Sequence, residues 1–203
     1  MSALKCDPQV TLAIGGWNEG SSKYSEMAAD PAARQQFAAS ALSFIRQHNF
    51  DGLDLDWEYP GKRGGTAADK ENFIRLIQDL YKVFRPAGLM LTAAIGAAPD
   101  TIDAAYDIER MYQYLDYVHV MCYDYHGKWD KKTGHNAPLR PRPDESSKDL
   151  TLNIDYTLQY LIQLGARPEK TVLGVPFYGR AFQLVNSALN KIGDPVKDTS
   201  FQV

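Results

Sequence analysis

Hydrophobic and polar positions along this chain form short apolar runs separated by longer segments with helical periodicity. Runs rich in β-branched and apolar residues predict buried strands. Five such strands are expected, at Val10 to Ile14, Phe50 to Trp57, Leu89 to Ile95, Tyr117 to Tyr123 and Thr171 to Pro176. The first run ends at Gly15-Gly16, which predicts a tight turn.

Helical patterns separate all of these strands. Asp30-Pro31 has the residues typical of a helix start, an N-cap followed by proline at the first helical position. Further helices are predicted at 68–84, 104–114 and 152–164. Strands that alternate with helices are typical of a parallel sheet with crossover connections, so the sequence predicts an α/β fold.

The length of the chain leaves its architecture open between two alternatives. A complete eight-stranded α/β barrel needs about 250 residues, whereas this chain has 203. Five strands therefore indicate either a smaller open sheet or part of a barrel. A long polar loop is expected from His126 to Lys148, and the segment after Gly179 is less periodic, compatible with the start of an insertion.

Composition and charge exclude some classes of function. Hydrophobic residues make up 44% of the chain and charged residues 23%, as in ordinary globular proteins. The formal net charge is -3, which argues against nucleic acid as a partner. No apolar window reaches membrane-spanning length, so no membrane partner is expected. Met1 to Gln9 lacks the apolar core of a signal peptide.

The two cysteines, Cys6 and Cys122, allow at most one disulfide. Cys122 lies inside an apolar run, so we expect a small buried side chain rather than a disulfide partner.

The acidic second strand carries the clearest chemical signal. Side chains alternate along a strand, so Asp54, Asp56 and Glu58 are expected on one face, opposite Leu53, Leu55 and Trp57. Mutual repulsion and burial favour the protonated form of at least one carboxyl near neutral pH. Glu58 is the longest and lies nearest the carboxyl end of the strand, which suits a general acid. An exposed acidic edge or a Mg²⁺ or Ca²⁺ site are the alternatives; no further acidic cluster completes a metal site.

These residues resemble a known family. Asp51-Gly-Leu-Asp54-Leu-Asp56-Trp-Glu58 resembles the DxxDxDxE signature of the family 18 glycoside hydrolases, the chitinases, at every fixed position. Three other segments are similar to family strands in the same order: Ala13 to Trp17, where Ala13 replaces a serine, Met121 to Asp124, and Gly174 to Arg180. The sequence around Trp17 and around Trp129 is similar to that of arthropod chitinases.

The resemblance implies a partial (β/α)8 TIM barrel, approximately strands 3 to 7 with their helices. Residues 1–203 would form part of a chitinase catalytic domain, with an insertion after the seventh strand starting at about residue 181. The first two strands and the eighth are expected outside the chain. The resemblance also implies an extracellular location and neither cofactor nor metal.

The resemblance further implies catalysis assisted by the substrate. Glu58 would protonate the glycosidic oxygen while the N-acetyl carbonyl of the substrate attacks the anomeric carbon. Asp56 would orient the acetamide, and Asp54 would share a proton with Asp56. Asp51 has the opposite strand parity, so a structural role beside Gly52 is expected.

The remaining implied contacts are with sugar. Tyr123 and Asp124 would contact the acetamide and Met121 would lie beneath it, although barrel core is an equal alternative for Met121. Trp17 and Trp129 are candidates for stacking on sugar rings. Tyr178 and Arg180 would bind sugar further along the cleft. Packing alone is an alternative for Tyr178 and Trp17, and His119 is expected to be a satisfied core histidine.

The function expected from this resemblance is an endo-acting, retaining chitinase that cleaves β-1,4-linked N-acetylglucosamine. Chitin or chito-oligosaccharides would be its partners. The alternatives are a chitin-binding lectin without turnover and an inactive fragment of a chitinase. The glutamate at position 58 favours the enzyme, since family members that lack activity commonly replace this acid.

Overall fold

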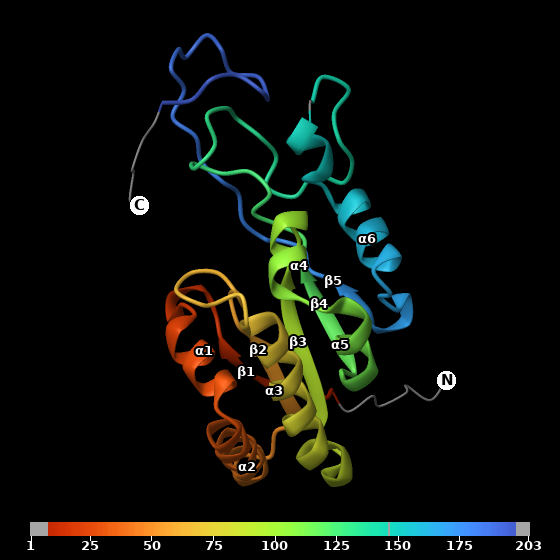
Figure 1. Ribbon diagram of the computed structural model, residues 1–203. Helices are drawn as coiled ribbons and strands as arrows, with labels where there is room; N and C mark the ends of the chain where they lie inside the picture. The colour runs from red at the N-terminus through yellow and green to blue at the C-terminus, as the bar shows by residue number, and fades with distance from the viewer. Residues whose placement is uncertain (1–7, 146, 198–203) are drawn as a thin grey trace, which may run out of the picture.

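Five parallel strands form one sheet at the centre of this computed structural model, which describes residues 8–145 and 147–197 (Figure 1). The strands lie side by side in chain order, each hydrogen-bonded to the next in parallel register. They are β1 (Thr11–Gly15), β2 (Gly52–Asp56), β3 (Met90–Gly96), β4 (Tyr117–Met121) and β5 (Thr171–Leu173). The predicted α/β fold with parallel strands is confirmed.

The helices lie together on one side of this sheet (Figure 1). They are α1 (Ser22–Ala29), α2 (Pro31–Gln47), α3 (Asp69–Phe84), α4 (Pro99–Ala105), α5 (Ile108–Tyr114) and α6 (Ile154–Gln163). Short 3₁₀ turns occur at Trp17–Glu19, Arg85–Ala87, Ser147–Thr151 and Pro168–Lys170. At the start of α2 the Asp30 side chain accepts a hydrogen bond from the backbone N–H of Ala32 at 2.8 Å, as the sequence predicts.

The hydrophobic core lies between the sheet and these helices. Leu53, Leu55 and Trp57 are all buried on the helix side of β2, as strand alternation predicts. The Trp57 ring stacks on Tyr24 from α1 at 5.9 Å and meets Phe73 from α3 edge-on at 5.7 Å. This packing fixes the orientation of β2 and so directs its acidic side chains to the opposite face.

Four expectations about the elements are wrong. The helix α1 is missed, and the single helix expected at 104–114 is two helices, because Asp107 caps α5 by accepting a hydrogen bond from Arg110 N–H. The first strand is not buried: β1 pairs on one side only within the described residues, and its side chains are half-buried or exposed. The strands β2, β4 and β5 also end earlier than expected, whereas β1 and β3 each extend one residue further at the carboxyl end.

Two loops join at the carboxyl end of the sheet, at the top of Figure 1. The segment 126–149 after β4 pairs with the segment 181–197 through one isolated bridge, Lys132 to Pro195, whereas a second bridge, Leu184 to Val196, lies within the segment 181–197. The expected insertion from about residue 181 therefore folds back onto the β4–α6 loop as far as residue 197; residues 198–203 lie outside the described residues.

Among the two cysteines, Cys122 is a free, fully buried thiol, as predicted, and burial raises its pKa to about 11. Cys6 and most of the expected Met1 to Gln9 segment lie outside the described residues. No described helix has both the length and the apolar character needed to span a membrane.

Candidate active site

Three carboxyl groups follow one another along the carboxyl half of β2 and the residues just after it. Asp54 and Glu58 are buried, at 8% and 9% exposure, and Asp56 is half-buried. They interact: the negative charges of Glu58 and Asp54 both raise the pKa of Asp56. The predicted grouping of these acids on the face away from the helices is thus present.

Asp54 is held by two neighbouring strands. Thr92, its register partner on β3, donates its hydroxyl to Asp54 Oδ1 at 2.5 Å, and His119 Nδ1 on β4 lies 3.0 Å from the same oxygen. The hydrogen bond with Asp54 raises the pKa of His119, an effect that burial opposes. His119 is satisfied as predicted, but it is not a core residue, since 37% of its side chain is exposed.

Of the three carboxyl groups, Asp56 lies where a negative charge is least favourable. Burial, then the charges of Glu58 and Asp54, raise the pKa of its carboxyl to about 6. Its Oδ1 is a buried oxygen without a hydrogen-bond partner in the described protein. Buried polar atoms are nearly always paired, so this oxygen is suited to accept a hydrogen bond from a bound molecule.

Glu58 is surrounded by groups of mixed character. Burial raises the pKa of its carboxyl; a side-chain hydrogen bond with Tyr59 and the charge of Arg63 lower it, and the charge of Asp124 raises it. The Arg63 guanidinium also donates to the Glu58 backbone carbonyl at 3.0 Å. Burial is the largest of these effects, which favours a protonated carboxyl as a general acid requires.

The turn after β1 lies against the carboxyl end of β2 and leads directly to an aromatic residue. Gly15 has φ +120, and a Cβ there would lie 2.0 Å from the Asp56 carbonyl oxygen, so only glycine permits this approach. The predicted tight turn is present, with Gly16 N–H donating to the Asp56 carbonyl at 2.8 Å. Trp17 follows directly and is 58% exposed.

A second set of side chains follows β4. Met121 ends the strand half-buried, and Tyr123 lies close enough to the acids that Asp56 and Glu58 raise its pKa further after burial does. Asp124, with φ 59, accepts hydrogen bonds from the Tyr178 hydroxyl at 2.8 Å and from Arg180 Nε at 2.7 Å. The structure therefore brings together residues from the β4 and β5 segments that lie more than fifty positions apart.

The remaining predicted residues fall into two groups. Trp129 is exposed, as predicted, and the Arg180 guanidinium lies 5.2 Å from its ring centre. Asp51 lies outside the carboxyl network, and its Oδ2 accepts the Val10 backbone N–H at 2.6 Å. Gly52 leaves no room for a side chain, because a Cβ would approach the Met90 carbonyl oxygen to 2.3 Å.

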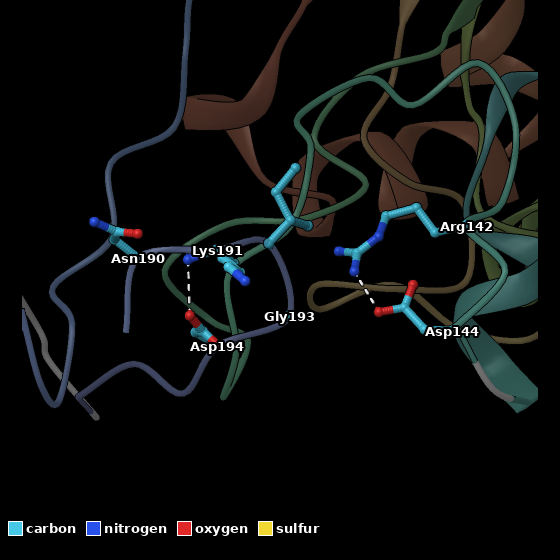
Figure 2. Close-up of a pocket in the computed structure, with 7 residues that line it drawn as sticks. Arg142, Asp144, Asn190, Lys191, Gly193 and Asp194 are labelled. Carbon is cyan, nitrogen blue, oxygen red and sulfur yellow. Dashed lines mark hydrogen bonds and ion pairs between the residues drawn. The ribbon is translucent and has the colours of Figure 1, made fainter. Parts of the chain in front are cut away.

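An open hollow of about 660 Å³ lies apart from these carboxyls, in the joined loops (Figure 2). Its lining is mainly polar and charged, from Arg142, Asp144 and the segment 190–194, with Ile192 as its apolar member. Arg142 is paired with Asp144, and the backbone N–H of Lys191 donates to Asp194 at 2.7 Å. Within the described ranges no group of three or more His, Cys, Asp or Glu side chains forms a candidate metal site.

A model of the family described as glycosyl hydrolases family 18 matches residues 2–202. The chain belongs to glycosyl hydrolase family 18. Its five-stranded sheet with outer helices is accordingly part of an (β/α)8 barrel, as the resemblance implies. The alternative of a smaller open-sheet fold is thereby excluded.

This family 18 chain has relatives of high similarity. It is 51% identical over 189 residues to probable chitinase 2 of Drosophila melanogaster, covering 93% of this chain and 38% of that protein. A solved Group IV chitinase of Ostrinia furnacalis in complex with allosamidin matches with TM-score 0.90 and 44% identity, over 93% of this chain and 52% of that one.

Human YKL-39, described as a pseudo-chitinase with retained chitooligosaccharide binding properties, matches with TM-score 0.86 and 32% identity, over 93% of this chain and 52% of that one. The chain thus spans about half or less of the length of these relatives.

Sequence reasoning missed three residues of this family 18 site: Thr92, Tyr59 and Arg63. Thr92 could have been found by aligning the strands, since parallel register places it beside Asp54. No periodic signal marks Arg63, which lies in a loop and reaches Glu58 only through the three-dimensional path of that loop.

Proposed function

We propose that this chain carries the catalytic carboxyls of a chitinase that hydrolyses β-1,4-linked N-acetylglucosamine with retention of configuration. The observation that carries the proposal is the unpaired buried Oδ1 of Asp56, next to the buried acid Glu58. An acetamide N–H is a donor that this oxygen can accept. The chitinases among its relatives and the allosamidin complex support the same substrate class.

Glu58 acts as the general acid. Its buried carboxyl gives its proton to the glycosidic oxygen as the bond to the anomeric carbon breaks. The carbonyl oxygen of the substrate acetamide forms the new bond to that carbon, which gives a cyclic oxazolinium ion instead of a covalent enzyme intermediate. Water then attacks the anomeric carbon from the face opposite the acetamide oxygen and gives a proton to the Glu58 carboxylate. The bond between that carbon and the acetamide oxygen breaks, which restores the acetamide.

Asp56 holds the acetamide during this step. Its unpaired Oδ1 accepts the acetamide N–H, and its negative charge stabilises the positive oxazolinium. With a pKa of about 6, Asp56 exchanges a proton readily, and Asp54 is the acid next to it. Thr92 and His119 keep Asp54 in place for this role.

The aromatic and polar residues around the acids bind the rest of the sugar chain. Tyr123 and Asp124 contact the acetamide, and Met121 lies beneath it. Trp17 and Trp129, both more than half exposed, stack on pyranose rings. Tyr178 and Arg180 fix Asp124 and add donors further along the chain of sugars.

The test is a comparison of wild type with Glu58→Gln on a chito-oligosaccharide. We expect hydrolysis to fall by about 10²–10⁴-fold, while binding measured by calorimetry stays the same. The products of the wild type should keep the β anomer at first, as seen by NMR. Glu109→Gln, on an exposed position of α5, is the matched control.

Two results would contradict the proposal. Hydrolysis by Glu58→Gln at the rate of the wild type would exclude Glu58 as the acid. Binding without hydrolysis by the wild-type chain would favour the chitin-binding alternative, for which the match to YKL-39 gives a precedent.

We also infer an extracellular location, on the basis of the family resemblance, and an insertion after the last strand that begins near residue 181. A fusion of the complete parent protein to a secretion reporter tests the location.

A further inference from the structure

The side chain of Arg63 links an exposed aromatic ring to the backbone of the proposed acid. Its guanidinium carbon lies 3.5 Å from the centre of the Trp17 ring, a stacking distance. The same guanidinium donates to the Glu58 carbonyl oxygen at 3.0 Å. One side chain therefore contacts both the β1–α1 loop and the β2–α3 loop.

The backbone holds Arg63 in this position. Its φ of 54 is in the left-handed region, which an arginine adopts only when its surroundings fix it. Its carbonyl accepts the Ser21 N–H at 3.3 Å, and Gly64 follows with φ +93, where a Cβ would lie 2.6 Å from Ser22 Oγ. The loop that carries Arg63 is thus attached directly to the loop that carries Trp17.

Arg63 leaves Trp17 with one free face. The guanidinium covers one face of the indole, and Tyr59 meets it edge-on at 6.5 Å, yet the side chain remains 58% exposed. An indole with one covered face and one open face has the shape of a platform for a pyranose ring. Tyr59 also shares a side-chain hydrogen bond with Glu58. The Tyr59 side chain therefore contacts both the Trp17 ring and the Glu58 carboxyl.

We propose that Arg63 is a positioning residue that fixes Trp17 as a sugar platform and sets its orientation relative to Glu58. Trp17 alone is anchored by a short 3₁₀ turn, Trp17–Glu19, between Gly16 and Gly20, so its ring needs support from outside its own loop. Arg63 supplies this support and thereby determines how tightly longer sugar chains bind. This inference rests on the proposed function, because it assumes a chito-oligosaccharide as the ligand.

The experiment measures binding of chitotriose and chitohexaose in the Glu58→Gln background, where no turnover interferes. Arg63→Met removes the guanidinium and keeps an unbranched side chain. We expect it to weaken hexaose binding by about three- to tenfold and triose binding less, with Arg63→Lys intermediate. Arg46→Met, on an exposed position of α2, is the matched control and should bind like the parent.

A merely structural role is separated by two further readouts. Trp17→Ala combined with Arg63→Met should show a non-additive loss of hexaose affinity, since Arg63 acts through Trp17. Without ligand, acrylamide should quench the Trp17 fluorescence, taken as the difference from Trp17→Ala, more strongly after Arg63→Met.

The outcomes are distinguishable. Hexaose binding that Arg63→Met leaves unchanged, or losses that simply add, overturn the role of Arg63 and leave the proposed function standing. Absence of binding by the parent chain overturns the proposed function, and the sugar platform with it.

Discussion

At the residue scale, the environment of Asp56 makes the negative charge of its carboxylate unfavourable. Burial, Glu58 and Asp54 together raise the pKa of its carboxyl from 3.8 to about 6. Because the folded state binds this proton more tightly than the unfolded state, the stabilising contribution is complete below pH 3.8 and is lost as the pH rises through about 6. Charged Asp56 therefore lowers the free energy of unfolding at neutral pH.

Asp56→Asn is expected to stabilise the chain at pH 7.5 and to leave it nearly unchanged at pH 4. Since Asp56 is half-buried, solvent screening limits the gain to about 1 kcal/mol, or a rise in Tm of about 2–4 °C. Thermal melts across this pH range check it, with Glu26→Gln on an exposed position of α1 as the control. An equal change in Tm at both pH values would show that Asp56 is not the titrating group.

The acids themselves could be predicted from strand alternation, because the position of a side chain along a strand decides the face on which it lies. Their partners could not, since Thr92 and His119 reach Asp54 from two other strands. The expectation of a buried core histidine for His119 was wrong for the same reason: burial depends on what covers the strand, which its own sequence does not contain.

At the element scale, the loop between β2 and α3 is organised by Asp69. This carboxylate is fully buried and accepts the Gly61 N–H at 3.1 Å, the Thr66 N–H at 2.8 Å and the Ser25 hydroxyl at 2.6 Å. It therefore fixes the same loop that carries Arg63. The sequence predicted a loop and a helix here but not the acid that closes the loop, because its partners lie on α1 and far along the loop.

Asp69→Ala should destabilise the chain strongly, because it leaves the buried Ser25 hydroxyl and the N–H groups of Gly61 and Thr66 without their acceptor. We expect a loss of about 2–4 kcal/mol in the free energy of unfolding, with faster proteolysis between residues 61 and 66. Ser25→Ala, which removes a single hydroxyl from this cluster, should cost less. Urea denaturation and limited proteolysis check both variants, with Asp155→Ala in α6 as the control. A loss no larger than that of the control would contradict the role of Asp69.

At the scale of the whole molecule, the alternation of strands and helices predicted the parallel sheet and its order of elements. It could not distinguish part of a barrel from an open sheet, because barrel closure depends on strand tilt and stagger rather than on periodicity. The resemblance to family 18 indicated part of a barrel, and the family match confirms this. Within the described residues, β1 and β5 each pair on one side only.

The free edge at β5 gives the last prediction, which concerns self-association. Val172, Leu173, Val175 and Phe177 are all exposed there, Phe177 completely. Unpaired backbone groups next to exposed apolar side chains favour pairing with another strand. We therefore expect this chain to associate as its concentration rises, and Val172→Lys with Phe177→Ser to reduce the association.

Sedimentation velocity over a range of concentrations checks this association. The control is Phe44→Ser, which removes an exposed ring from α2, away from the strand edges. It should leave the association constant unchanged, because the backbone groups of a helix such as α2 bond within the helix and do not form a strand edge. A monomer at all concentrations, or equal association by the edge variant and the control, would show that the β5 edge does not drive self-association.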